Sequence, residues 1–255
     1  MSIHAPRIYI FDNVKALLIM LVVLGHAADY YTADSKAMRI FFFYIYLFHM
    51  PLFIFLAGLF SKSTIMKNPF RLEKVAYFIT LYILLEFLFY LMLNVWMGRD
   101  NHEFNLFETD GVPWFMLAMA AWLCIGRLIR TIPARITLPT SILLAVLVGY
   151  TNIGDILVLS RIIVFLPFFL LGYYMKPQAL VDILHSKLLK FASVLLLLLA
   201  GYYIATSIDT LYDARNLLSG RNPYDKVAID LGIPFDGAIL RLIIMGATIS
   251  LSIAV

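Results

Sequence analysis

Charged side chains are scarce in this chain of 255 residues, where Asp, Glu, Lys and Arg together make up 14%. A soluble domain carries roughly a quarter charged residues, whereas here hydrophobic residues reach 62% and the mean hydropathy is +0.89. A soluble fold must expose much of its surface to water, so a single core could not hide this many apolar side chains. The scarcity of charge therefore excludes an ordinary soluble protein and indicates a membrane protein.

Three further features are missing, and each excludes one possibility. Cys124 is the single cysteine, so no intrachain disulfide can form. The lysines and arginines form no dense patch interleaved with aromatic residues, which excludes a nucleic-acid-binding protein despite an isoelectric point near 9.1. The sequence also lacks a repeat of about 20 to 50 residues, which excludes a solenoid.

What the chain has instead is a series of long apolar segments. A membrane helix needs about 20 mostly apolar residues, and eight segments approach this length, of which 138–150 is short enough to be tilted or re-entrant. We therefore predict an all-α, polytopic transmembrane bundle that forms one domain over residues 1–255. The last apolar run continues to Val255, so further helices are expected beyond it. The eight predicted spans are 8–30, 39–60, 75–96, 112–129, 138–150, 158–175, 189–207 and 237–255.

The basic residues between the spans predict the orientation. With the N-terminus in the cytoplasm, eleven of the twenty lysines and arginines fall on the inner side and six on the outer side, with three inside spans. Cytoplasmic loops carry an excess of Lys and Arg. The sequence therefore predicts a multi-pass protein of the cell membrane with a cytoplasmic N-terminus.

Several ionisable residues fall inside or at the edges of these spans, where each costs about 2.5–3.5 kcal/mol unless it faces protein or water. In the first span, Lys15 and His26 are eleven residues apart and nearly eclipsed on one helical face, about 16 Å apart along the axis. Asp12 and Asp29 lie on the same side. We expect this polar edge to face a watery cavity, where His26 can remove a proton from a hydroxyl. Alternatively, Asp12 and Lys15 form a structural ion pair at i, i+3.

The later spans hold other unusual residues. In the second span, Pro51 should kink the helix and free a carbonyl one turn earlier, while Ala57 and Gly58 should allow close helix contact. His49 in the same span is either a ligand or base, or a hydrogen-bonded histidine of the bundle. Glu86, in the middle of the third span, needs a partner that the sequence does not identify.

These residues, in this order, resemble the acyltransferase-3 membrane family, and most closely its fucose 4-O-acetylase-like branch. The resemblance starts with Asp12, Lys15 and His26. It continues with Phe-His-Met-Pro-Leu-Phe at 48–53 and Ala57-Gly58. Pro-Trp-Phe-Met-Leu at 113–117, Ser-Arg at 160–161 and Leu-Pro-Phe-Phe-Leu-Leu-Gly-Tyr at 166–173 complete it. Each block is weak alone, and their common order is fairly specific.

The resemblance implies a bundle of about ten helices that transfers acetyl groups from cytoplasmic acetyl-CoA to carbohydrate hydroxyls. The family's arginine-x10-histidine motif falls on Lys15 and His26, and its arginine-x-x-arginine motif falls on Arg71 and Lys74, each with one lysine in place of arginine. We assign His26, Asp12 and Lys15 to catalysis, and Lys15, Arg71 and Lys74 to the CoA donor. The residues assigned to the acceptor are His49, Glu86, Trp114 and Arg161.

Alternatives remain beside this hypothesis. A secondary transporter or flippase for a polysaccharide precursor also concentrates charge within the membrane, and a non-catalytic scaffold would tolerate loss of these residues. Arg71 and Lys74 also fit simple anchoring at the cytoplasmic interface, and Trp114 fits an interfacial aromatic belt. The loop 209–236, which includes Arg215, either contacts a sugar or is a solvated connector. We expect membrane lipid and a carbohydrate as partners, with no metal and no nucleic acid.

Overall fold

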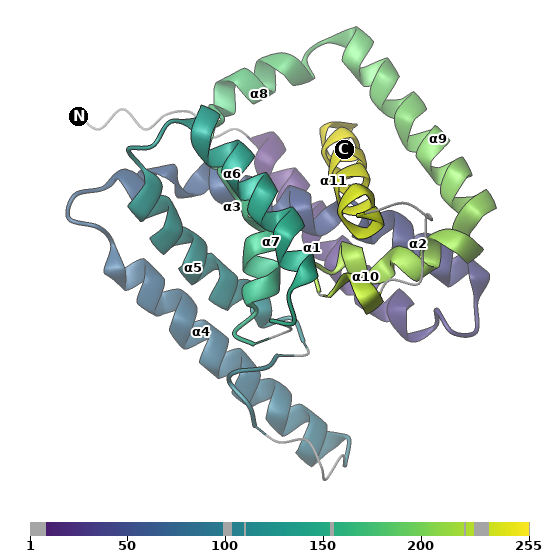
Figure 1. The fold of residues 1–255 in the computed structure, drawn as a ribbon, viewed down its shortest axis with the longest axis horizontal. Coiled ribbons are helices and arrows are strands. Elements are labelled where there is room, and N and C mark those ends of the chain that lie inside the picture. The colour runs from purple at the N-terminus through teal and green to yellow at the C-terminus, as the bar shows by residue number, and fades with distance from the viewer. Residues whose placement is uncertain are drawn as a thin grey trace.

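The structure is a computed structural model that describes residues 9–98, 104–109, 111–153, 156–221, 223–226 and 235–254, and it is built from helices (Figure 1). Within these residues the only pairing of extended segments is a single bridge between Glu108 and Ile156. The helices are α1 (Tyr9–Tyr30), α2 (Lys36–Tyr46), α3 (His49–Met66), α4 (Leu72–Leu91), α5 (Trp114–Ile129), α6 (Ala134–Leu147), α7 (Leu159–Tyr174), α8 (Pro177–Leu184), α9 (Lys187–Leu211), α10 (Arg215–Leu218) and α11 (Asp236–Ala254).

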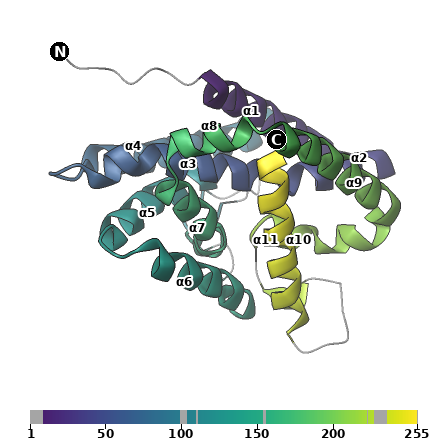
Figure 2. The same ribbon diagram turned by 90° about the horizontal axis from the view of Figure 1, so that it is seen from above.

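Each of the eight predicted spans coincides with a helical segment. Five segments are long and apolar enough to cross a bilayer, namely 9–30, 36–66, 72–96, 187–218 and 236–254. The other three are shorter apolar helices at 114–129, 134–150 and 159–174. The all-α polytopic fold is therefore confirmed. Helices α4 and α9 form opposite edges of the molecule in both views (Figures 1 and 2), and their outer faces expose large apolar side chains of the kind that lipid covers.

The second span differs from its prediction, because it is two helices and not one kinked helix. Helix α2 ends at Tyr46, and α3 starts at His49 after the turn residues Leu47 and Phe48. Pro51 is then the third residue of α3, where a missing N–H costs little because first-turn amides have no partner within the helix. The Leu47 carbonyl, four residues before Pro51, accepts a hydrogen bond of 2.7 Å from the Thr248 hydroxyl of α11. The carbonyl freed at the break thus finds its hydrogen-bond donor on another helix.

Helices α3 and α7 pack unusually closely through two glycines. A methyl group on Gly58 would collide with the carbonyl oxygen of Phe169 in α7, and one on Gly172 would collide with the carbonyl oxygen of Phe55 in α3. Small residues at membrane-helix contacts allow backbones to approach in this way. The expectation of close contact at Gly58 is confirmed, and Gly172 is its counterpart on α7.

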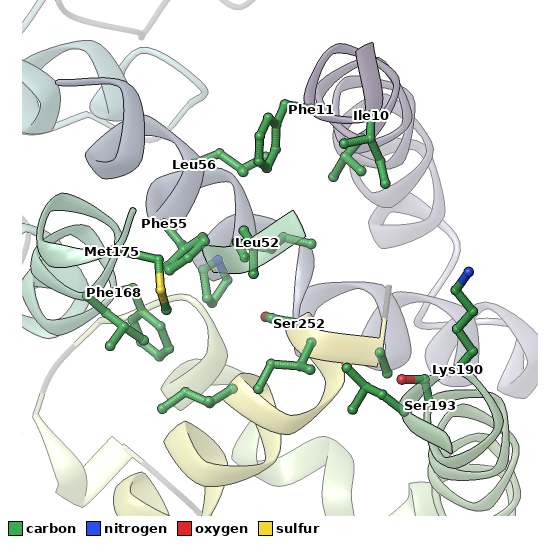
Figure 3. Close-up of a pocket in the computed structure, with 18 of the residues that line it drawn as sticks. Ile10, Phe11, Leu52, Phe55, Leu56, Phe168, Met175, Lys190, Ser193 and Ser252 are labelled. Carbon is green, nitrogen blue, oxygen red and sulfur yellow. The ribbon is translucent and has the colours of Figure 1, made fainter. Parts of the chain in front are cut away.

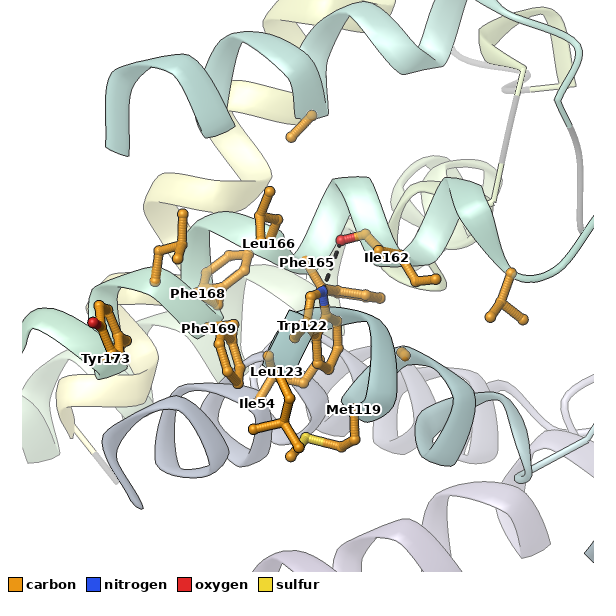
Figure 4. Packing of buried hydrophobic residues seen from close by; sticks show 14 of the residues in the cluster. Ile54, Met119, Trp122, Leu123, Ile162, Phe165, Leu166, Phe168, Phe169 and Tyr173 are labelled. Carbon is orange, nitrogen blue, oxygen red and sulfur yellow. Dashed lines mark hydrogen bonds between the residues drawn. The ribbon is translucent and has the colours of Figure 1, made fainter. Parts of the chain in front are cut away.

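The main core lies where α3, α5 and α7 meet (Figure 4). The fully buried Trp122 ring of α5 stacks on Phe169 at 5.5 Å between centroids. Its indole N–H donates to the Ile162 carbonyl of α7 at 3.0 Å. A buried tryptophan that satisfies its N–H fixes two helices in register. Helices α5 and α7 are therefore tied together, and their N-terminal ends contribute to the site described next.

Candidate functional site

A polar cavity of about 340 Å³ lies at the end of the molecule where α1 ends and where α5 and α7 begin. Four of the nine residues predicted for the site line it: His26, His49, Trp114 and Arg161. They come from four different helices, α1, α3, α5 and α7, so the fold gathers residues that are up to 135 positions apart in the sequence. The other described lining residues are Asp29, Phe42, Tyr46, Met50, Gly111, Phe165, Arg215, Asn216, Leu218, Ser219 and Arg221.

Two histidines share this cavity, and a tyrosine contacts both. The Tyr46 ring makes edge contacts with His26 at 6.3 Å and with His49 at 4.8 Å between centroids, and it stacks on Phe42 at 3.9 Å. His26 is exposed toward the cavity, whereas His49 is 1% exposed. The Nδ1 atom of His49 lies 2.8 Å from the Ile45 carbonyl oxygen. Because a carbonyl only accepts hydrogen bonds, Nδ1 carries the proton, which leaves Nε2 of the neutral ring as an acceptor.

Arg161 and Trp114 form a second group on the wall of this cavity. The Arg161 side chain is 5% exposed, and its guanidinium carbon lies 5.2 Å from the centroid of Trp114. Trp114 in turn stacks on Phe165 at 5.7 Å. A guanidinium over an indole face gains cation–π stabilisation and is held in one orientation. The tryptophan therefore positions the arginine, a role beyond the interfacial belt that its sequence context suggested.

Sequence reasoning missed several residues of the cavity. Tyr46 ends α2 and His49 begins α3, so the contact between their rings depends on the break between these helices, which the sequence did not predict. Arg215 and Arg221 lie in and just after the short helix α10, in the loop for which the sequence left open a sugar contact or a solvated connector. Nothing in the local sequence shows that this loop folds back over the ends of α5 and α7.

A second cavity, of about 370 Å³, lies at the other end of α1 (Figure 3). Ile10 and Phe11 from the start of α1, Met175 from beyond the end of α7 and Lys190 from the start of α9 contribute to its walls. Its lining is mostly apolar, and its polar side chains are those of Lys190, Ser193 and Ser252. The molecule thus has an apolar cavity at one end and a polar cavity at the other.

A much smaller space of about 20 Å³ lies between the two cavities. Pro51 and Phe168 are shared between this space and the apolar cavity, while Tyr46, Phe165 and Leu218 are shared between it and the polar cavity. Arg241 of α11 also lines it, 2% exposed, with its guanidinium carbon 5.1 Å from the Tyr224 ring centroid. Burial raises the pKa of the Tyr224 phenol, so it stays neutral beside this arginine.

Five of the predicted residues line neither cavity. Lys15 lies 3.9 Å from Asp12 and has its ammonium 3.9 Å from the ring centroid of Phe60 in α3, so the alternative of an i, i+3 ion pair is present. The expected continuous polar edge of α1 is therefore divided, because His26 and Asp29 face the polar cavity and Lys15 packs against α3. The remaining three residues are Arg71 immediately before α4, Lys74 in its first turn, and the buried Glu86 in its second half. No group of three His, Cys, Asp or Glu side chains arranged to hold a metal occurs in the part of the chain that the structure describes.

Comparison with known proteins gives a match over nearly the whole chain. The acyltransferase-3 family model, described as an acyltransferase domain, matches residues 8–253. Nodulation protein NolL of Sinorhizobium fredii (strain NBRC 101917 / NGR234) is 43% identical over 63 residues, which are 24% of this chain and 17% of that protein. NolL of Mesorhizobium japonicum is 38% identical over 63 residues, which again are 24% of this chain and 17% of that protein. The chain thus aligns with about a sixth of the length of these curated relatives, and no solved structure matches it.

Proposed function

Because this chain belongs to the acyltransferase-3 family, we propose that it is an integral membrane O-acyltransferase that moves an acetyl group from cytoplasmic acetyl-CoA to a hydroxyl of a cell-surface or exported carbohydrate. The observation that carries this proposal is the polar cavity, where His26 and His49 meet Arg161 and Trp114. The resemblance to the fucose 4-O-acetylase-like branch implies a sugar hydroxyl as acceptor. His26 faces the cavity from α1, next to Asp29, and acts as the base.

The two cavities suit the two substrates. With the N-terminus in the cytoplasm, the apolar cavity opens on the inner side, where acetyl-CoA is made, and Lys190 offers a cation at its wall. Arg71 and Lys74 begin α4 on the same side of the membrane, where basic side chains attract the phosphates of CoA. The polar cavity then opens on the outer side and takes the sugar. The acetyl thioester reaches the polar cavity through the small space lined by Pro51, Phe168 and Tyr46, which has to widen to admit it.

The transfer step follows from these positions. His26 accepts the proton of the acceptor hydroxyl as the hydroxyl oxygen attacks the thioester carbonyl carbon. The new ester C–O bond forms, the thioester C–S bond breaks, and the CoA thiolate takes up a proton as it leaves. Arg161, held over Trp114, supplies positive charge near the oxygen on which negative charge develops. The reaction needs no redox partner and no metal.

Replacement of His26 tests this proposal. In membranes that carry His26→Ala, acetylation of surface glycan from radiolabelled acetyl-CoA should fall by about 10²- to 10⁴-fold, the usual contribution of a general base. His185→Ala is the matched control, because His185 is an exposed histidine that lines neither cavity. Acetylation that is equal in the two variants would rule out His26 as the base.

A further inference from the structure

Among the described residues that line the polar cavity, positively charged side chains outnumber acidic ones. Three arginines, Arg161, Arg215 and Arg221, contribute to its walls, and Asp29 is the one acidic side chain among the described lining residues. A guanidinium stays protonated at every physiological pH. A hydroxyl-bearing neutral sugar can be held by tyrosine, asparagine and tryptophan side chains, so three arginines exceed what its recognition requires. The charge points to a negatively charged group on the ligand.

The arginines are held in place by the elements that carry them. The Ser160 hydroxyl, next to Arg161 at the start of α7, donates to the Gly220 carbonyl oxygen, next to Arg221. Gly220 has a φ of +71°, a conformation that favours glycine, and it sits against the ring of Phe165. This contact fixes the turn that carries Arg221 onto the helix that carries Arg161.

Arg215 is oriented separately, by an aromatic ring. Its guanidinium carbon lies 4.6 Å from the centroid of Tyr212, and its Nη1 donates to the Tyr212 carbonyl oxygen at 3.5 Å. A stacked guanidinium keeps its planar fork of N–H donors in one orientation, which matches the paired oxygens of a carboxylate or phosphate. The cavity therefore presents oriented N–H donors. One of these donor groups is the guanidinium of Arg215, which belongs to the short helix α10.

We propose that Arg161, Arg215 and Arg221 bind an anionic group of the acceptor, a carboxylate or a phosphate, that lies beside the hydroxyl to be acylated. The acceptor is then an acidic glycan or a phosphorylated sugar and not a neutral one. The assignment of this ligand as the acceptor rests on the proposed function, whereas the anion site itself does not.

Equilibrium binding to the purified full chain in detergent, without acetyl-CoA, tests the site. One pair of probes is a glucuronate-containing oligosaccharide and the same oligosaccharide with its carboxylates reduced to hydroxymethyl groups. The other pair is a sugar phosphate and the free sugar. We expect the anionic member of at least one pair to bind about ten- to a hundredfold more tightly, the usual effect of a charge-assisted hydrogen bond. The pair that shows the difference identifies the source of the anion.

The arginine variants then locate the site. Arg215→Gln and Arg221→Gln should each remove most of the preference for the anionic probe, and Arg215→Lys should keep part of it, because lysine retains the charge without the fork. Arg135→Gln is the control, since Arg135 is exposed at the start of α6 and lines neither cavity. Equal affinity for both members of both pairs, or a preference that survives both glutamine substitutions, overturns the proposal. A preserved anion preference in a protein that transfers no acetyl group would instead count against the proposed reaction.

Discussion

At the scale of single residues, the structure separates groups that hold the fold from groups that face the cavity. His49 and Arg161 are both buried, yet each has a packing partner that fixes it, Ile45 for the imidazole and Trp114 for the guanidinium. His26 differs from both, because it is exposed at the cavity and its ring contacts Tyr46 only by an edge. Of these three side chains, His26 is the one that is accessible from the cavity, and it is the one to which we assign the proton transfer.

The sequence predicted the members of this site better than their arrangement. His26, His49 and Arg161 could be found because an ionisable side chain in or at the edge of a membrane span is unusual in itself, whereas Trp114 was found through the family resemblance. Lys15 was placed with His26 because helical periodicity fixes the angle between them, but periodicity does not fix the cavity that each one reaches. The Lys15 side chain packs instead against the ring of Phe60 in α3. Tertiary contacts of this kind leave no mark in the local sequence.

Trp122 gives a prediction at this scale, because it contributes both volume and a hydrogen bond to the core. Trp122→Phe removes the donor to the Ile162 carbonyl and leaves part of the site beside Phe169 empty. We expect the free energy of unfolding in detergent micelles to fall by about 1–3 kcal/mol, with denaturant titration as the measurement. Trp96→Phe is the control, because Trp96 is 88% exposed. An equal effect of the two substitutions would contradict the role given to the indole N–H.

At the scale of helices, the sequence correctly predicted that the eight helical segments exist and approximately where they end. It did not predict that the second segment is divided into two helices. All eight apolar segments are helical because segment length and hydropathy alone decide this in a membrane. The break after Tyr46 could not be predicted, because Pro51 allows either a kink or a new helix start. The choice depends on Thr248, nearly 200 residues later, whose hydroxyl satisfies the Leu47 carbonyl.

The contact between α3 and α7 supplies a prediction at the scale of elements. Gly172→Ala places a methyl group against the backbone carbonyl of Phe55, which can move only if the whole helix moves. We expect the thermal unfolding midpoint to fall, with a loss of about 1–3 kcal/mol. The matched control is Gly246→Ala in α11, where nothing lies within 4 Å of the added methyl group and stability should stay the same or rise. Equal midpoints for the two variants would show that α3 and α7 can separate at little cost.

At the scale of the whole molecule, the polar and the apolar cavity lie at opposite ends of α1. The turn between α1 and α2 lies at the end with the polar cavity, and the turn between α5 and α6 lies at the opposite end of α5. The proposed direction of transfer, from donor inside to acceptor outside, depends on which end faces the cytoplasm.

Cysteine labelling tests this orientation. In a Cys124→Ser background, Asp34→Cys places a thiol in the exposed turn after α1, and Thr131→Cys places one in the exposed turn after α5. With the N-terminus in the cytoplasm, a membrane-impermeant maleimide added to intact cells should label the first variant and reach the second only after permeabilisation. The reverse pattern would invert the protein and place the arginine-lined cavity in the cytoplasm.

The small space between the cavities has a consequence for the energetics of the cell. At about 20 Å³ it has room for roughly one water molecule, so it forms a constriction between the two cavities. Arg241 places a positive charge in the same narrow segment, and a fixed cation at a constriction opposes the passage of other cations. In the proposed orientation, each cavity can thus admit its own substrate while the positively charged constriction between them opposes the leak of protons.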